Sequence, residues 1–277
     1  MKIILTTLFT SFVFFSFSQE FNQAEIFPFR SRDNGKIGYV NNEGEIIIEP
    51  KYSSGTYFDN EEYATVSIKN DSIKKFAVID KNGNYLISFN EGYELISLNN
   101  NYEDWILVIK KDKWGYINYE KETIIPLEYE HLGDFYGDLA FAKKDGKYGF
   151  INSKNEIIID FEFDWAFKFG AIQPNGLRYA KVEKNEKLGF INNKGILEVK
   201  LLYDFVYQFY KGIAIVKKEN KYGCINTNGD IVVPFKYEFI DDNDGEIIKA
   251  RKKFMSNKEY HYNRQGDFIG TAIKNKR

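Results

Sequence analysis

The 277-residue chain is poor in the side chains from which metal centres are usually built. It has two histidines, His131 and His261, and neither lies near the other or near the one cysteine, Cys224, so no zinc-binding spacing is present. The acidic segment DDNDGE (241–246) lacks acidic ligands at the first and twelfth positions of a calcium-binding loop. We interpret it as a solvated loop. A single cysteine also excludes an internal disulfide, so we expect neither a metal site nor a cross-linked fold.

The chain also lacks a large excess of either charge and lacks cofactor-binding motifs. The 38 basic and 40 acidic residues are interspersed, so no basic stripe favours nucleic acid. The sequence contains no phosphate loop, dinucleotide fingerprint or G-x-S-x-G nucleophile elbow. We therefore predict a protein without a cofactor that is not an enzyme.

One group of acids keeps a catalytic alternative open. Asp160, Glu162 and Asp164 alternate along "IIIDFEFDW", and paired carboxylates at a suitable separation hydrolyse glycosides. Because the chain has 40 acids, clusters of this kind arise by chance. A glycoside hydrolase is therefore the least favoured of the functions considered.

The N-terminus has the pattern of a secretory signal peptide. One lysine precedes an apolar run, and the small residues Ser16 and Ser18 stand three and one positions before a cleavage point at Gln19. A retained membrane anchor is the alternative. We predict a signal peptide at 1–18, an exported mature chain (periplasmic, cell-surface or extracellular), and one domain over 19–277.

One phrase recurs along the mature chain. "KYGFINSKNEIIID" (147–160) is followed by "KLGFINNKGILEV" and "KYGCINTNGDIVV" and preceded by "KWGYINYEKETII". Aligned on its glycine, the phrase occurs at Gly38, Gly115, Gly149, Gly189 and Gly223, with degenerate copies at Ala77 and Tyr260. The seven copies are spaced by 34–40 residues, which is typical of propellers and solenoids.

Each repeat reads as short strands. "LAFAKK" (139–144) alternates apolar and polar residues, the turn "KDGK" follows, and "YGFIN" and "EIIID" supply two further strands. The segment between two recurring aromatics is a candidate for a short fourth strand. No helical periodicity appears, so we predict an all-β fold.

Two positions of the phrase have structural interpretations. We interpret the recurring glycine as a point where an aromatic side chain of a neighbouring repeat lies across the strand. Three residues later, an Asn or Asp is expected to start a turn by bonding its own backbone. These turn residues are Asn41, Asp80, Asn118, Asn152, Asn192, Asn226 and Asn263.

The phrases resemble the WG repeats, named for a Trp-Gly pair in a "K-W-G-[YF]-I" core followed by a "G-[KE]-I-[VI]-I-P-…-Y" strand and turn. Trp114-Gly115 has the literal pair, and "PLEY" (126–129) and "PFKY" (234–237) keep the Pro-x-x-Tyr ending. The resemblance covers about residues 27–270. It implies a repeat scaffold that is often exported, and it transfers no catalytic residue.

Seven such repeats can close into a propeller-like ring or form an open solenoid of stacked hairpins. A strand from 20–26 that completes the last sheet would close the ring and remove both sheet edges. We favour a closed or near-closed ring, and the open solenoid is the alternative.

Aromatic residues in the variable segments between repeats are the candidate ligand-facing groups: Trp105, Trp165 and Tyr207, with Tyr57, Tyr136 and Tyr210 nearby. The competing interpretation is that most of them are core side chains between repeats. If exposed, they would bind a protein partner or stack on sugar rings. We therefore predict an exported scaffold for protein–protein interaction, and a carbohydrate- or peptidoglycan-binding module is the alternative.

Overall fold

The computed structural model describes residues 25–58, 62–70, 73–98, 102, 104–241 and 246–273. These residues form seven antiparallel sheets, in which strands adjacent in sequence are adjacent in space. The predicted signal peptide lies outside the described residues. Within the described ranges, no helix has the length and hydrophobicity needed to cross a membrane.

The first four sheets have these strands. The first sheet contains β1 (Phe27–Arg30), β2 (Ile37–Val40) and β3 (Ile46–Tyr52). The second contains β4 (Ser54–Gly55), β5 (Tyr63–Asn70), β6 (Ile73–Asp80) and β7 (Tyr85–Ile87), followed by the 3₁₀ turn η1 (Phe89–Glu91). The third contains β8 (Leu95–Leu98), β9 (Ile106–Lys110), β10 (Lys113–Ile117) and β11 (Thr123–Tyr129). The fourth contains β12 (His131–Leu132), β13 (Leu139–Lys144), β14 (Lys147–Asn152) and β15 (Ile157–Phe163).

The last three sheets repeat the same order. The fifth contains β16 (Trp165–Ala166), β17 (Tyr179–Lys184), β18 (Lys187–Asn192) and β19 (Leu197–Tyr203). The sixth contains β20 (Phe205–Val206), β21 (Ile213–Lys218), β22 (Lys221–Asn226) and β23 (Ile231–Tyr237). The seventh contains β24 (Phe239–Asp241), β25 (Ile248–Arg251), β26 (Lys258–Tyr262) and β27 (Phe268–Ile273). The expected short fourth strand is confirmed.

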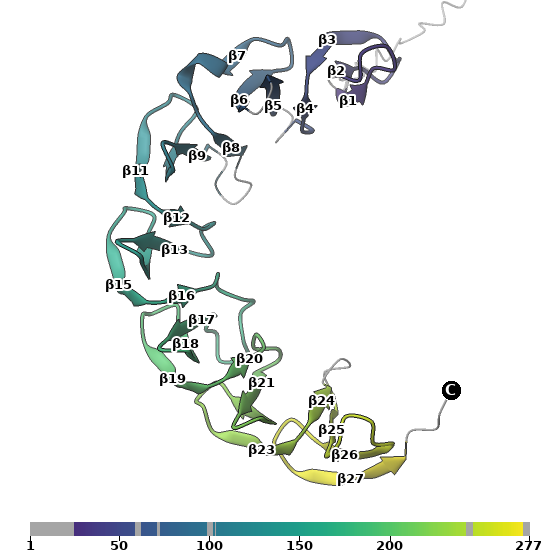
Figure 1. The fold of residues 1–277 in the computed structure, drawn as a ribbon, viewed down its shortest axis with the longest axis vertical. Helices are drawn as coiled ribbons and strands as arrows, with labels where there is room; N and C mark the ends of the chain where they lie inside the picture. The colour runs from purple at the N-terminus through teal and green to yellow at the C-terminus, as the bar shows by residue number, and fades with distance from the viewer. Residues whose placement is uncertain are drawn as a thin grey trace, which may run out of the picture.

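The sheets form an open arc and not a ring (Figure 1). The first and seventh sheets lie at the two ends, and among the described residues no strand of one pairs with a strand of the other. The four strands of the seventh sheet all come from its own repeat. Residues 20–24 of the segment expected to close the ring lie outside the described residues. The described residues therefore form the open arrangement, which was the alternative, and they do not form a closed ring.

The first strand of each four-stranded sheet lies on the concave side, and the fourth on the convex side, as β20 and β23 or β24 and β27 show (Figure 1). Apolar side chains fill the junctions between neighbouring sheets. Phe135, for example, packs against Tyr116 of the preceding sheet with ring centres 5.7 Å apart. Phe209 packs in the same way against Phe190 at 4.4 Å. Each junction is thus a small core shared by two repeats.

The repeat glycine is required by its own sheet, and the sequence interpretation named the wrong neighbour. A Cβ atom on Gly149 would lie 2.5 Å from the carbonyl oxygen of Ile159, in the adjacent strand β15. The pairing of β14 with β15 shifts register beside this glycine, and the resulting bulge brings the β15 backbone over it. The close approach was predicted correctly, but the approaching group is backbone of the same repeat rather than an aromatic ring of another.

Candidate functional site

The concave strands place aromatic residues at equivalent positions of successive sheets. Trp165 of β16, Phe205 of β20 and Phe239 of β24 stand opposite Glu183, Lys217 and Arg251 of the second strands, respectively. Because side chains alternate along a strand, the residue two positions later points to the same side. That residue is aromatic in two sheets, Phe167 and Tyr207.

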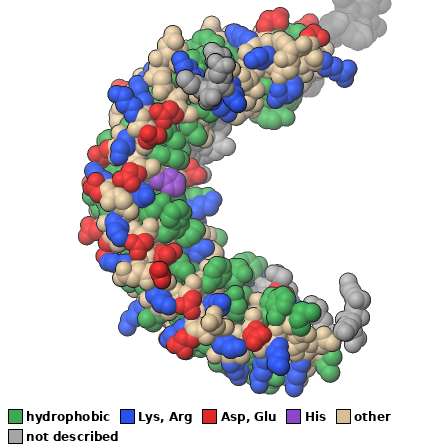
Figure 2. All heavy atoms as spheres, viewed as in Figure 1, with side chains coloured by type: hydrophobic (Ala, Val, Ile, Leu, Met, Phe, Trp, Pro, Cys, Tyr) green, Lys and Arg blue, Asp and Glu red, His purple; other side chains and the backbone are tan. Residues whose placement is uncertain are grey.

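These rings are accessible to solvent. Trp165 is 44% exposed and Tyr207 is 53% exposed, and Phe167 and Phe205 are also exposed. Figure 2 shows hydrophobic side chains gathered along the inner side of the lower half of the arc. Exposed apolar side chains gathered on one side of a protein, as here, are typical of interaction sites. We call the surface formed by Trp165, Phe167, Phe205 and Tyr207 the concave aromatic surface.

Cationic side chains lie over aromatic rings on and beside this surface. The Lys181 ammonium is 4.3 Å from the ring centre of Phe167, and the Arg251 guanidinium is 4.1 Å from that of Phe239. Burial lowers the pKa of Lys181, because an apolar environment disfavours the charged form. Cations held over rings combine positive charge with apolar area, which suits a partner that carries both acidic and apolar groups.

Two of the three predicted ligand-facing aromatics, Trp165 and Tyr207, are exposed on this surface. Trp105 lies apart from this surface and is partly buried. Its ring stacks on Tyr102 at 4.5 Å and packs edge-on against Phe135 at 5.3 Å, against the core between the third and fourth sheets. Phe167 and Phe205 were missed by the sequence analysis, although their spacing of two residues from Trp165 and Tyr207 is the signal that would have found them.

Two of the three acids considered for catalysis make contacts within the protein. Asp164 forms an ion pair with Lys147 and accepts a 2.7 Å hydrogen bond from the backbone N–H of Asn185. These interactions lower the pKa of the Asp164 carboxyl. Glu162 pairs with Lys184 at 2.7 Å, and Asp160 is exposed.

The backbone contact of Asp164 recurs through the chain. The equivalent residue in five other sheets accepts a hydrogen bond from backbone N–H groups in or next to the hairpin between the second and third strands of its sheet. These residues are Ser53, Glu94, Glu130, Asp204 and Glu238. The recurrence assigns Asp164 a structural contact that the sequence analysis did not recognise.

His131 and Cys224, the other residues considered for chemistry, pack against apolar and aromatic neighbours. His131 lies among Trp114, Phe141 and Tyr148. Cys224 is buried in the core between the sixth and seventh sheets, as expected for a small apolar residue. Across the described ranges, no three His, Cys, Asp or Glu side chains are grouped to hold a metal ion. Residues 242–245 of the acidic loop lie outside the described residues.

Comparisons with known proteins support the repeat architecture. The family model described as "WG containing repeat" matches residues 37–71, 114–148, 148–187, 189–222 and 222–253. No curated protein sequence matches the chain.

Solved structures give weaker likenesses. A eukaryotic initiation factor is 13% identical with a TM-score of 0.46, over 90% of this chain and 73% of that chain. Dihydro-heme d1 dehydrogenase NirN is 10% identical with a TM-score of 0.39, over 91% of this chain and 64% of that chain. A quinonprotein alcohol dehydrogenase-like protein from Bacteroides thetaiotaomicron is 11% identical with a TM-score of 0.34, over 90% and 76%.

These TM-scores are below 0.5 and support no inference about this chain. The matches to the family model, in contrast, cover more than half of the chain. They also coincide with repeats found in the sequence. The chain belongs to the family of proteins built from WG containing repeats.

Proposed function

We propose that the mature chain, residues 19–277, is an exported scaffold without enzymatic activity that binds another protein through its concave aromatic surface. The observation that carries this proposal is the exposure of aromatic pairs on the concave strands of two successive sheets, Trp165 with Phe167 and Phe205 with Tyr207. Aromatic side chains are enriched among the residues that dominate binding energy at protein interfaces.

The open arc supports a role in holding a partner. A curved array of repeats presents an extended concave surface, which repeat proteins use for binding. The cations over Phe167 and Phe239 favour a partner segment with acidic and apolar side chains. Electrostatic attraction of this kind speeds association and weakens with salt.

Export is supported by the N-terminal sequence, in which a short apolar run ends at Ser16 and Ser18 before Gln19. The mature protein is expected to begin at Gln19 and to be recovered outside the cytoplasm. N-terminal sequencing of the protein from fractionated cells tests both points. Recovery of the intact N-terminus in the cytoplasm would refute export.

The binding proposal is tested by cross-linked capture of proteins from the envelope fraction of the source cells at moderate salt. We expect one or two enriched proteins, lost when Trp165→Ala and Tyr207→Ala are combined. Tyr85→Ala is the matched control, because Tyr85 is 45% exposed but belongs to β7 on the convex side.

Capture that persists in the double variant would refute the concave aromatic surface as the binding site. Retention of polysaccharide instead of protein, lost in the same variant, would replace the scaffold by the carbohydrate-binding alternative. Thermal unfolding of each variant shows whether a loss of capture reflects a loss of folding.

A further inference from the structure

At the concave side of the junction between the second and third sheets, the first strand carries smaller side chains than in the sixth sheet. Ser54 of β4 pairs with Ser67, and the backbone N–H of Thr56 bonds the carbonyl of Thr65. In the sixth sheet, Phe205 and Tyr207 occupy the same two positions relative to β21. The second sheet therefore has two small hydroxyl side chains where the sixth has two large rings.

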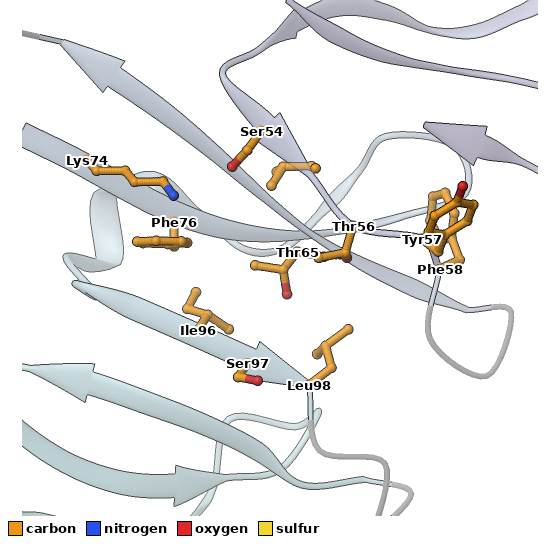
Figure 3. A pocket seen from close by; sticks show the side chains of 12 residues that line it. Ser54, Thr56, Tyr57, Phe58, Thr65, Lys74, Phe76, Ile96, Ser97 and Leu98 are labelled. Carbon is orange, nitrogen blue, oxygen red and sulfur yellow. The ribbon is translucent and has the colours of Figure 1, made fainter. Parts of the chain in front are cut away.

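This junction holds a pocket of about 590 Å³ (Figure 3), and the junction of the sixth and seventh sheets, where Tyr207 is in the lining, holds a smaller one of about 430 Å³. Ser54, Thr56 and Thr65 line one side, and Ser97 of β8 lies on the facing sheet. Phe76 supplies an apolar wall, and the Lys74 ammonium lies 4.6 Å from its ring centre. Ligand pockets in proteins have volumes of about 300–1,000 Å³, so this one has the size of a small-molecule site.

The hydroxyl groups on the second sheet are held in place by the protein. The Ser54 and Ser67 hydroxyls lie 2.6 Å apart, and the Thr56 hydroxyl oxygen accepts the backbone N–H of Thr65 at 3.0 Å. Since a hydroxyl also carries a hydrogen that can be donated, Thr56 can donate to a bound molecule. The site thus presents fixed groups that both donate and accept.

Thr65 adds an open hydrogen-bonding group to the pocket. It is only 8% exposed, and Figure 3 shows its hydroxyl directed into the pocket. Among the described residues, that hydroxyl has no hydrogen-bond partner. Because the hydroxyl opens to the pocket and is not sealed in the core, it can both donate to and accept from a bound molecule with hydroxyl groups of its own.

We propose that this pocket binds a neutral sugar ring. A sugar offers hydroxyl groups that donate and accept at once, and it has apolar C–H faces that fit against an aromatic wall such as Phe76. Lys74 is the one charged side chain among the described residues that line the pocket. The lining therefore offers no second charge for a ligand that carries several charged groups. The site is separate from the concave aromatic surface and does not depend on the proposed protein binding.

The test is calorimetric titration of the purified protein with maltotriose, cellotriose and chitotriose. We expect at least one of the three to bind. Thr65→Val keeps the side-chain shape and removes the hydroxyl, and it should weaken binding about tenfold. Thr56→Tyr installs the residue found at the equivalent position of the sixth sheet and should abolish binding, because the ring removes the Thr56 hydroxyl from its place and takes up part of the pocket volume.

Thr123→Val is the matched control, because Thr123 is exposed at the start of β11 on the convex side; it should leave binding unchanged. Thermal unfolding establishes that each variant is folded. Absence of binding for all three sugars, or binding that survives Thr56→Tyr, would overturn the proposal. Loss of sugar binding in these variants with normal protein capture would separate this site from the concave aromatic surface.

Discussion

Asn84 donates a 2.9 Å side-chain hydrogen bond to Asp80, and this pair reverses the arrangement of the corresponding turns in other repeats. At those turns an Asn comes first and donates to a carboxylate four residues later. The pairs are Asn41 with Glu45, Asn118 with Glu122, Asn152 with Glu156, Asn226 with Asp230 and Asn263 with Asp267. The amide and the carboxylate are thus exchangeable as long as one of each is present.

The first residue of each turn also organises the backbone. The side-chain oxygen of Asn152 accepts the N–H groups of Lys154 and Glu156 at 3.0 and 2.9 Å. Asp80 accepts the equivalent N–H groups of Asn82 and Asn84 at 2.9 and 2.8 Å. Partial burial raises the pKa of Asp80, but the hydrogen bonds from Asn84, Asn82 and Gly83 outweigh it, and the net pKa is lowered.

We predict that Asn152→Asp destabilises the protein and that Asn152→Asp combined with Glu156→Asn restores stability. The single change places two carboxylates side by side at a turn where Asn152 is only 7% exposed, at a cost of about 1–2 kcal/mol. The double change recreates the Asp80–Asn84 pair. Urea denaturation of both variants measures the free energies of unfolding, and a double variant no more stable than the single one would contradict the exchange.

The repeated strands and the turn residues could be predicted because they depend on local signals. Alternating apolar residues define a strand such as β13, and an Asn such as Asn152 bonds backbone within four positions of itself. The bulge of β15 over Gly149 could not be predicted in the same way. It depends on the register between two strands, which the spacing of apolar residues in either strand leaves open.

Long-range features were also less predictable. Closure depends on the small angles between neighbouring sheets summed along the arc, and no single residue encodes those angles. Trp105 and Trp165 are the same residue type in comparable inter-repeat segments, but only Trp105 meets Tyr102 and Phe135. Their different exposure follows from these neighbours and not from the tryptophans themselves.

Gly149→Ala should destabilise the protein by about 2 kcal/mol or more, because the new Cβ atom would lie 2.5 Å from the Ile159 carbonyl oxygen. The second sheet supplies the control. Its pairing of β6 with β7 ends opposite Val78, so Ala77 pairs with Val66 of β5 but has no β7 residue across it and tolerates a Cβ atom. Ala77→Gly should cost only about 1 kcal/mol. Urea denaturation compares the two variants, and equal losses would refute the backbone explanation.

Trp105→Ala should lower the free energy of unfolding by about 3–5 kcal/mol, because Trp105 packs on Tyr102, Tyr116 and Phe135 in the core. Trp165→Ala removes a side chain that is 44% exposed and should cost about 1 kcal/mol or less. Chemical denaturation measures both. A Trp105→Ala protein as stable as the wild type would contradict a structural role for Trp105 and favour its ligand-facing interpretation.

His131 should make the stability of the protein depend on pH. Burial among aromatic rings, followed by the nearby Lys143 charge, lowers the pKa of His131 below its usual 6.5. Around it lie the Tyr148 hydroxyl, 3.3 Å from Nδ1, and Glu130, which pairs with Lys143 at 3.7 Å. The folded protein therefore keeps this imidazole neutral at a pH where the unfolded chain already binds a proton.

The unfolded state then binds more protons than the folded state between the lowered pKa and about 6.5. The free energy of unfolding should consequently fall as the pH is lowered through this window. His131→Phe, which suits the surrounding rings of Trp114 and Phe141, should remove this dependence. The variant should still lose stability at lower pH, where Asp164 and Asp204 become protonated. Denaturation of both proteins at a series of pH values measures their free energies of unfolding. If these change in parallel with pH above about 5, His131 is not the source of the pH dependence.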